Sequence, residues 1–373
     1  MRFTHSEHPQ RLYFGTGTAA ADVAEEVATL GASRLLLISE NAVAGFAEAI
    51  AAGLPVVARI SEVVQHVPLD RAEQARALAA QQEVDAVISV GGGSAVGLAK
   101  AIALTTGLPI VAVPSTYAGS EATVAWGITA QNRKETGVDP RVLPAAVVAD
   151  PELTAGLPLP LSMASGLNAA AHAVDSFWAP NADPVNASTA AEGLRAMVAG
   201  LRALRRDEAA TGREQCLLGA YLCAKAFSSA GSGLHHKICH VLGGAYDMPH
   251  APTHAAVLPY VLAFNAGHAP DAVRRVAAAL DRPTHSTSGA TTGEVVAAWS
   301  DLVAELGVTT ALRDVAEAGG ASLTEAGLDE AARLVLPVVP ASNPRPVGEA
   351  EMRAILRAAW AADDPASLLT TSE

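Results

Sequence analysis

The sequence predicts two structural classes in one chain, an α/β half with a parallel sheet followed by an all-helical half. The chain has 373 residues, which is long for a single core and favours two domains. Apolar runs alternate with segments of helical period up to about residue 155, and the strand signals stop there. We therefore expect an α/β domain over residues 1–155 and a helical domain over residues 156–373.

Short apolar runs bounded by polar residues are expected to form the strands of the first half. A short edge strand or hairpin is expected at 11–16, and buried strands at 34–39, 56–60, 85–90, 109–113 and 145–150. Between them, helical periodicity predicts helices at 18–31, 42–52, 70–82 and 95–104. Because strand and helix alternate, the strands should be parallel and joined by crossover helices.

The second half is expected to consist of helices separated by proline and glycine. The cleft between the two halves is the default position for a binding site. The expected helices cover 162–178, 186–206, 213–227, 254–265, 270–282, 292–304, 322–337 and 347–361.

Composition excludes some partners and favours a reducing compartment. The net charge of −13 argues against nucleic acid, although a local positive pocket could still bind an acidic substrate. Cys216, Cys223 and Cys239 are three in number and lack paired spacing, so we expect reduced thiols and a cytoplasmic protein. No apolar stretch is long enough to span a membrane, so no membrane partner is expected.

Five of the eleven histidines lie between Ser232 and His254. A helix there places His236 and His240 one turn apart on one face. Gly243 and Gly244 are expected to end this helix. The turn at Pro249 can bring His250 back to the same face.

Asn168 and His172 repeat the four-residue spacing on another expected helix. Two such pairs and a loop histidine are typical of a metal pocket or a proton-transfer pocket. The alternative is a set of unrelated surface histidines.

Two polar loops follow neighbouring strands of the α/β half. Gly91, Gly92, Gly93 and Ser94 lie where a strand becomes a helix, so their backbone could approach a pyrophosphate. The alternative is a tight turn with Ser94 as the helix N-cap. Residues 114–121 form the second loop, and together the loops predict a nucleotide crevice. Its candidate binding residues are Ser115, Thr116 and Ser120, and the alternative is a helix start to which Glu121 contributes.

Taken together, the motifs resemble the iron-containing (group III) alcohol dehydrogenase family. The resemblance implies an N-terminal dinucleotide-binding domain, a helical C-terminal domain and a homodimer, which the apolar edge strand also favours. Within the family, the chain is most similar to enzymes that use NAD(P)H to reduce the carbon–carbon double bond of maleylacetate to 3-oxoadipate during the breakdown of aromatic compounds. The matching segments are 63–68, 91–104, 114–121, 136–144, 165–172, 233–255 and 342–347.

The resemblance also predicts a change at the metal site. Metal-dependent relatives use one aspartate and three histidines, and the equivalent residues here are Asn168, His172, His236 and His250. Because asparagine lacks an anionic oxygen, we expect no metal, although three histidines could still hold zinc. Without a metal, these residues and His240 would form a cationic, hydrogen-bonding pocket for a dicarboxylate, with His240 or His250 closest to proton transfer.

The family pattern predicts NADH as the cofactor, with NADPH as an alternative. The position that binds the adenosine ribose in relatives corresponds to Ser39, with Glu40 beside it. Lys134 matches a lysine near the cofactor ribose, or else is a solvated loop residue. Gly97 replaces an aspartate of the relatives. Further candidates for the pocket are His235, Lys237, His254 and Arg345, the last of which could instead be an ordinary turn residue.

Other reactions fit the same fold. A metal-dependent alcohol or aldehyde reductase is the main alternative, and a related reductase in a biosynthetic pathway would have the same motifs. A synthase that uses NAD transiently needs a metal and basic residues for a phosphate substrate. The shortage of lysine and arginine near the histidines argues against that third reaction.

Overall fold

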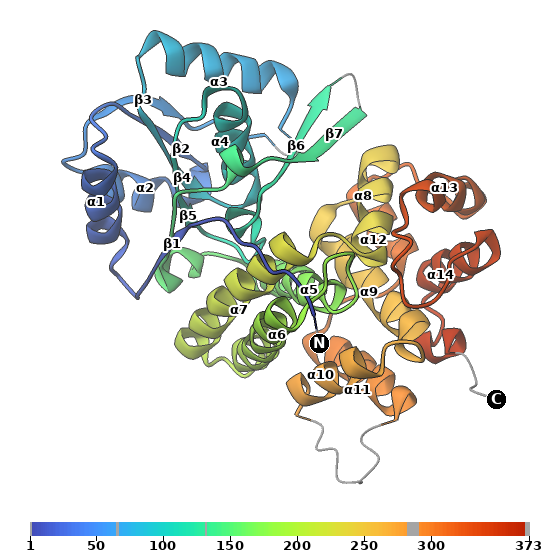
Figure 1. Ribbon diagram of the computed structural model, residues 1–373. Coiled ribbons are helices and arrows are strands. Elements are labelled where there is room, and N and C mark those ends of the chain that lie inside the picture. Colours follow the sequence, from blue (N-terminus) through green and yellow to red (C-terminus); the bar gives the residue numbers. More distant parts are fainter. Residues whose placement is uncertain (1, 65–66, 131–132, 282–290, 370–373) are drawn as a thin grey trace.

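The α/β domain is built on one six-stranded parallel sheet, as the alternating pattern predicts. The computed structural model describes residues 2–64, 67–130, 133–281 and 291–369 (Figure 1). The strand order is β1-β8-β5-β4-β2-β3, and every pairing is parallel. The strands are β1 (Arg11–Phe14), β2 (Leu35–Ser39), β3 (Val56–Ile60), β4 (Ala86–Gly91), β5 (Ile110–Pro114) and β8 (Ala146–Ala149).

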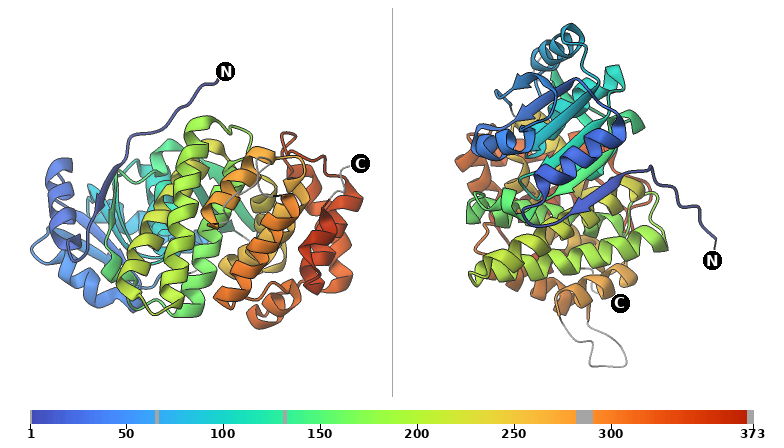
Figure 2. Two further views of the ribbon diagram at one scale, coloured as in Figure 1. Left: turned by 90° about the horizontal axis from the view of Figure 1, so that it is seen from below. Right: turned by 90° about the vertical axis from the view of Figure 1, so that its left-hand side faces the viewer.

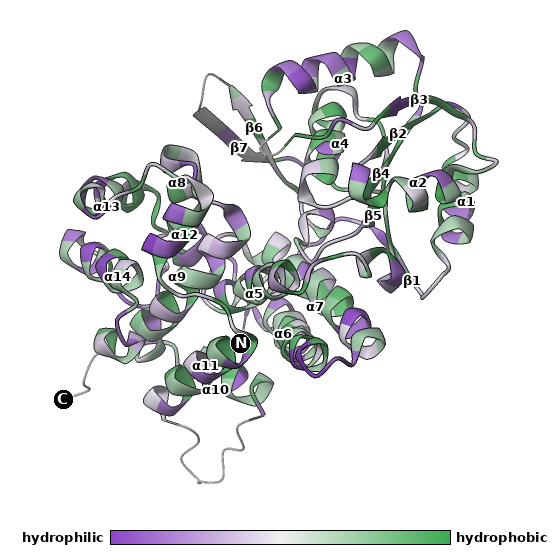
Figure 3. Ribbon diagram, turned by 180° about the vertical axis from the view of Figure 1, so that it is seen from behind, coloured by the Kyte–Doolittle hydropathy of each residue, from purple (hydrophilic) through white to green (hydrophobic). Residues whose placement is uncertain are grey.

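Helices cover both faces of this sheet because the strand side chains alternate between faces. Leu36 and Ile38 of β2 pack in the core under α3 and α4, whereas Leu35 and Leu37 pack under α1 and α2. In Figure 3 the central strands are hydrophobic, while α3 has hydrophilic stretches on its outer side. The helices are α1 (Ala19–Leu30), α2 (Ala44–Ala51), α3 (Leu69–Gln81) and α4 (Gly93–Thr106).

The second half of the chain is helical, as expected. Helix α5 is buried along nearly its whole length and packs against α6, α7 and α9 (Figures 1 and 2). The helices are α5 (Leu159–Ser176), α6 (Pro184–Arg205), α7 (Ala209–Ala230), α8 (Leu234–Tyr246), α9 (His250–Ala266), α10 (Pro270–Ala279), α11 (Thr292–Leu306), α12 (Leu312–Gly319), α13 (Leu328–Val335) and α14 (Glu349–Ala361).

Four elements differ from the sequence-based expectation. Strands β6 (Ala125–Ala130) and β7 (Arg133–Val138) form a separate hairpin that reaches toward α8 and was not predicted (Figure 1). They form a two-stranded sheet apart from the main one, and Thr129 of β6 also makes an isolated bridge to Pro68. Neither strand has the long apolar run of the buried strands. Helix α12 was also not predicted. Helix α8 continues through Gly243 and Gly244 and ends at Tyr246, where the C-cap Asp247 has a φ of 57° and provides the left-handed turn.

The topology identifies one edge of the sheet as the place for a ligand. Strand β3 follows β2 on one side, whereas β4 lies on the other side of β2. Ligands of open α/β sheets bind at such a switch point, beyond the carboxyl ends of the strands. The loops after β2 and β4 therefore face one crevice. Among the described residues, no helix has the length and apolar character that crossing a bilayer requires.

Candidate functional site

The histidines of α5, α8 and α9 form one cluster with a buried floor and an exposed rim. The rings of His172 and His236 stack with centroids 4.8 Å apart and planes 16° from parallel. The His254 ring lies 4.8 Å from that of His236 and 4.4 Å from that of His250. His240 and His250 are exposed, and their centroids lie 6.5 Å apart. The expected convergence of His172, His236, His240 and His250 is therefore present, and His254 lies among them.

The structure adds a carboxylate that the sequence did not single out. Asp175 belongs to α5 and is fully buried, facing the N-terminus of α8. Its oxygens accept hydrogen bonds there from the backbone N–H groups of Gly233, His235 and His236. It also accepts a 2.9 Å hydrogen bond from Nδ1 of His236. An anion at a helix N-terminus is stabilised by these donors and by the helix dipole. Asp175 thereby fixes the His236 tautomer and leaves Nε2 as a lone-pair donor.

Burial keeps the floor of the cluster neutral. Burial lowers the pKa of His172 to about 4, against a smaller opposing effect of Asp175. The pKa values of His235, His236 and His254 are lowered well below the ordinary histidine value, mainly by burial and further by neighbouring imidazoles. This differs from the expected cationic pocket, because these four rings are neutral near pH 7. Neutral imidazole is the form that binds metal ions.

Several polar atoms in this floor have no hydrogen-bond partner among the residues that the structure describes. They are buried, and they come from the positions that the family resemblance marks as ligands: Oδ1 of Asn168, Nδ1 of His172 and Nε2 of His236. An unpaired buried polar atom costs about 1–3 kcal/mol unless a ligand satisfies it. Together with Asp175 behind His236, these atoms fit a transition-metal ion.

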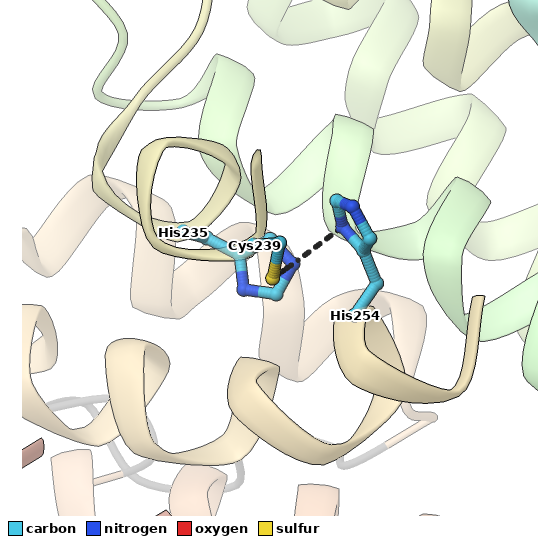
Figure 4. A group of neighbouring side chains, drawn as sticks. All are labelled: His235, Cys239 and His254. Carbon is cyan, nitrogen blue, oxygen red and sulfur yellow. Dashed lines mark hydrogen bonds between the residues drawn. The ribbon is translucent and has the colours of Figure 1, made fainter. Parts of the chain in front are cut away.

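A second group of possible metal ligands lies beside the group formed by Asn168, His172 and His236. His235 and Cys239 project from α8, and His254 projects from α9 toward them (Figure 4). One ligand atom from each of the three lies within 4.8 Å of the others, and all three residues are buried. Nε2 of His235 and Nδ1 of His254 also share a 3.0 Å hydrogen bond. Two imidazoles and a thiol are donors that zinc or iron accepts.

The first candidate cofactor loop is closed by a carboxylate from the neighbouring strand. Oε1 of Glu40, which follows β2, accepts a 3.1 Å hydrogen bond from the backbone N–H of Gly92. A Cβ on Gly92 would lie 2.9 Å from Cγ2 of Thr116, so glycine lets the two loops approach. Ser39 is the last residue of β2 and pairs with Val90. Glu40 thus lies across the switch point, at the start of α4.

Gly92 is the N-cap of α4, so the interpretation of Ser94 as the cap is wrong. Gly93 and Ser94 instead lie in the first turn of the helix. The N–H groups of a first helical turn have no partner within the helix, and they can donate to a phosphate.

The second loop is part of residues 114–125, which belong to the α/β domain and contact the helices of the second domain. These residues are here called the bridging segment. The backbone N–H of Tyr117 donates to Oγ of Ser165 on α5. Gly119 has a φ of 75° and packs so closely on α7 that a Cβ there would lie 2.6 Å from Cβ of Ala224. The same Cβ position is 3.6 Å from Cε1 of His172. The bridging segment therefore reaches the edge of the histidine cluster at Gly119, with Ser120 next to it in the chain, while Thr116 lies against Gly92 of the first loop.

Replacing Gly119 with alanine is expected to destabilise the fold by about 2 kcal/mol, because the methyl group overpacks the α7 contact and the left-handed backbone is strained. Turnover should fall by roughly tenfold or more because the loop shifts relative to His172. Thermal unfolding and steady-state kinetics measure the two effects. The matched control is Gly53→Ala, since Gly53 has a φ of 81° but no atom within 4 Å of its Cβ position. Equal losses in both variants would contradict the packing argument.

Some sequence-derived candidates lie elsewhere or are only partly described. Arg345 stacks 4.0 Å over the Phe264 ring and donates to the carbonyl oxygen of Leu368, so it is a structural residue of the helical domain. Lys134 pairs with Thr129 in the hairpin, and its side chain lies outside the described part of the structure. Lys237 is partly buried on α8.

The position of Gly97 is filled by another side chain. A Cβ on Gly97 would lie 2.8 Å from Cγ2 of Val67, a buried residue with a φ of 46°. Such a backbone is strained for a β-branched residue. An apolar contact thus stands where the resembling relatives have an aspartate, and no sequence signal pointed to Val67.

Comparison with known proteins identifies the family. The model of "Iron-containing alcohol dehydrogenase" matches residues 9–151, and that of "Fe-containing alcohol dehydrogenase family, C-terminal" matches residues 162–360. The chain belongs to the iron-containing alcohol dehydrogenase family. It is therefore an oxidoreductase of that family, and its α/β and helical domains have the family fold.

Individual relatives extend over nearly the whole chain. The maleylacetate reductase of Sphingobium indicum is 39% identical over 352 residues, which cover 94% of this chain and 95% of that protein. The structure of an iron-containing alcohol dehydrogenase from Corynebacterium glutamicum is similar with a TM-score of 0.91 and 47% identity, covering 99% of both chains. The structure of maleylacetate reductase from Agrobacterium tumefaciens has a TM-score of 0.87 and 38% identity, covering 98% of this chain and 100% of that chain.

The expectation that no metal is required is wrong. The chain belongs to an iron-containing family, and the described residues include a group of donors that could hold an ion. The expectation rested on the missing carboxylate at Asn168. It did not take account of Asp175, which supplies a negative charge behind His236, or of Cys239 and His254, which the fold brings beside the cluster.

Proposed function

We propose that this protein reduces the carbon–carbon double bond of maleylacetate to give 3-oxoadipate, with NADH as the reductant, in the breakdown of aromatic compounds. The observation that carries the proposal is the full-length similarity to maleylacetate reductases. The histidine cluster beside two polar loops supports it, because hydride transfer requires the nicotinamide and the substrate to meet there.

The reaction is a conjugate addition of hydride. NADH delivers hydride to the alkene carbon β to the ketone, and the π electrons move to the ketone oxygen to give an enolate. A proton then adds to the α carbon, which restores the ketone and leaves NAD⁺. Hydrogen-bond donors aimed at the developing enolate oxygen would stabilise the transition state.

The residues divide into binding and proton-transfer roles. Asn168, His172, His236 and His250 would hold a metal ion, and such an ion would supply Lewis-acid polarisation of the ketone and positive charge for the dicarboxylate. Asp175 orients His236 by accepting from its Nδ1. His240 lies on the exposed rim outside this ligand set and is the candidate for delivering the proton.

The cofactor site is proposed at the switch point of the sheet. Gly91, Gly92, Gly93 and Ser94 would bind the pyrophosphate at the start of α4. Ser115, Thr116 and Ser120 would bind the nicotinamide half. Glu40, beside Ser39, is placed to accept hydrogen bonds from the adenosine ribose and to repel a 2′-phosphate, which favours NADH with NADPH as an alternative.

Replacing Glu40 with glutamine is expected to raise the NADPH-to-NADH ratio of kcat/KM by roughly tenfold, because about 1.4 kcal/mol of charge repulsion is removed. Glutamine keeps an oxygen that can accept from Gly92. Steady-state kinetics with both cofactors measure the ratio. Glu48→Gln is the control, since Glu48 is an exposed partner of Arg59. An unchanged ratio in Glu40→Gln would show that this carboxylate does not select the cofactor.

The proposed activity is tested by mixing purified protein with NADH and maleylacetate. The expected result is a loss of NADH absorbance with formation of 3-oxoadipate, identified by mass spectrometry. No consumption of NADH by folded, metal-loaded protein would contradict the proposal.

A metal-dependent alcohol or aldehyde reductase is the second candidate. The observation that favours it is the 47% identity to a structure described as an iron-containing alcohol dehydrogenase. The two candidates are separated by comparing kcat/KM for maleylacetate with kcat/KM for simple alcohols and aldehydes. Efficient turnover of aldehydes without turnover of maleylacetate would favour this candidate.

We further propose a homodimer, a cytoplasmic location and a division into a dinucleotide-binding domain (1–155) and a substrate domain (156–373). The edge position of β1 supports the dimer, because only one side of that strand is paired within the sheet and Leu12 is exposed. Three free, buried cysteines support a reducing compartment. Sedimentation analysis measures the oligomeric state.

A further inference from the structure

Lys100 is a buried lysine that the proposed reaction does not use. It lies on α4, and its side chain is only 1% exposed. Its Nζ lies 2.6 Å from the carbonyl oxygen of Ser120, 2.8 Å from that of Thr123 and 2.8 Å from that of Ala125. Oγ1 of Thr123 is a fourth acceptor at 3.0 Å. An ammonium group has three N–H bonds, so these four oxygens form a complete cage around it.

All four acceptors belong to the bridging segment, between Ser120 and Ala125. The other side of this segment is held by the helical domain, because the backbone N–H groups of Tyr117 and Val124 donate to serine hydroxyls on α5 and α7. Gly119 packs on α7 next to His172. Lys100 therefore joins the helix that begins at the glycine loop to the segment that touches the histidine cluster.

The buried charge has a cost that an apolar residue would avoid. Burial lowers the pKa of Lys100 to about 7, and it raises the pKa of the nearby buried carboxyl of Glu121 to about 7. A methionine would fill a similar volume without this desolvation. A methionine cannot donate hydrogen bonds to three backbone carbonyls. The hydrogen bonds from Lys100 to these carbonyls fix the path of the bridging segment.

We propose that Lys100 is a positioning residue that sets the distance between the cofactor loops and the histidine cluster. This inference rests on the proposed function, since it assumes that NADH binds at these loops. Without the ammonium group, the bridging segment would lose its attachment to α4, and the nicotinamide would sample positions less suited to hydride transfer.

The first test is Lys100→Met, compared with Lys225→Met as the matched control. Lys225 lies on α7, and its Nζ pairs with Glu7 and donates to the carbonyl oxygen of His8 rather than to carbonyls of the bridging segment. For Lys100→Met we expect the KM for NADH to rise and kcat to fall, each by roughly tenfold. The deuterium isotope effect on kcat with NADH labelled at C4 should also increase, because hydride transfer becomes slower relative to product release. A loss of stability alone would leave this isotope effect unchanged.

The second test is chemical rescue of Lys100→Ala, which removes three methylene groups and the amine. Added n-propylamine has the missing atoms and is expected to restore a large part of kcat, whereas n-propanol of the same size should not. The rescue should saturate with amine concentration. This arm remains informative if Lys100→Met folds poorly, because the amine can be present during refolding.

The outcomes separate this inference from the proposed function. A folded Lys100→Met variant with the NADH affinity and isotope effect of the unmodified protein would overturn the positioning role. Equal rescue by amine and alcohol would also overturn it, since charge and N–H donation would then be irrelevant. If the unmodified protein neither binds NADH nor reduces maleylacetate, that result contradicts the proposed function itself and is obtained without any Lys100 variant.

Discussion

Replacing Asp175 with asparagine is expected to lower turnover of maleylacetate by roughly 100-fold, because outer residues that orient a metal-binding histidine have effects of this size. The same change should destabilise the protein by about 3 kcal/mol, since it breaks a fully buried charged contact. Both effects come from one carboxylate, which accepts from three backbone N–H groups, from Trp178 and from His236.

The chemical reason is a mismatch of donors. An asparagine side chain keeps one acceptor oxygen but directs an NH₂ group at neighbours that are themselves N–H donors. Nδ1 of His236 would lose its carboxylate partner, and the ring would be free to change tautomer or rotate. The metal affinity of the cluster should fall together with activity.

Activity, bound metal and thermal unfolding of Asp175→Asn should be measured beside Asp314→Asn. Asp314 is exposed and contacts Arg313, so the control removes a charge without touching the cluster. If Asp175→Asn kept full activity and full metal content, the orienting role of Asp175 would have to be given up.

The second large effect is expected from Asn168→Asp. This change adds an anionic oxygen one helical turn from His172, where Oδ1 of Asn168 is buried and has no hydrogen-bond partner among the described residues. We expect divalent metal affinity to rise by roughly tenfold or more and turnover of the dianionic substrate to fall by a similar factor, because one negative charge attracts the cation and repels the carboxylates.

Metal titration and steady-state kinetics on the same preparation measure both changes. Asn181→Asp is the control for the added charge, because Asn181 is exposed before α6. Unchanged metal affinity and turnover in Asn168→Asp would show that this position does not control the chemistry.

Cys239→Ser tests the second donor group, since it removes the thiol beside His235 and His254. Loss of bound metal in Cys239→Ser but not in His236→Gln would place the ion in that second group.

Local sequence patterns were sufficient for the architecture of most of the chain. The apolar runs at 34–39 and 85–90 form buried central strands, and the i,i+4 spacings of Asn168 with His172 and of His236 with His240 lie on helices. These predictions hold because side-chain period and burial are local consequences of strand and helix geometry. The pair of strands β6 and β7 was missed because Ile128 is the one buried position among their residues whose burial the structure describes, which is too few to give a period.

The chemistry of the site depended on contacts between residues far apart in the chain. Asp175 meets His236 over 61 positions, and Lys100 meets Thr123 over 23. Neither partner carries a sequence signal of its own, because a carboxylate or an ammonium group gains its role only from what the fold places around it. The same holds for the neutral state of the buried histidines, which follows from burial rather than from residue type.

Sequence patterns were enough for the strands of the main sheet, most of the helices, the two polar loops, and the histidines that gather in one region. Only the tertiary structure decided which groups complete the site: Glu40 across the glycine loop, Asp175 behind His236, and Cys239 with His254 as a second donor group. The physical reason is that local periodicity fixes which elements form, whereas hydrogen bonds, charge and metal-donor distances depend on how distant elements pack together.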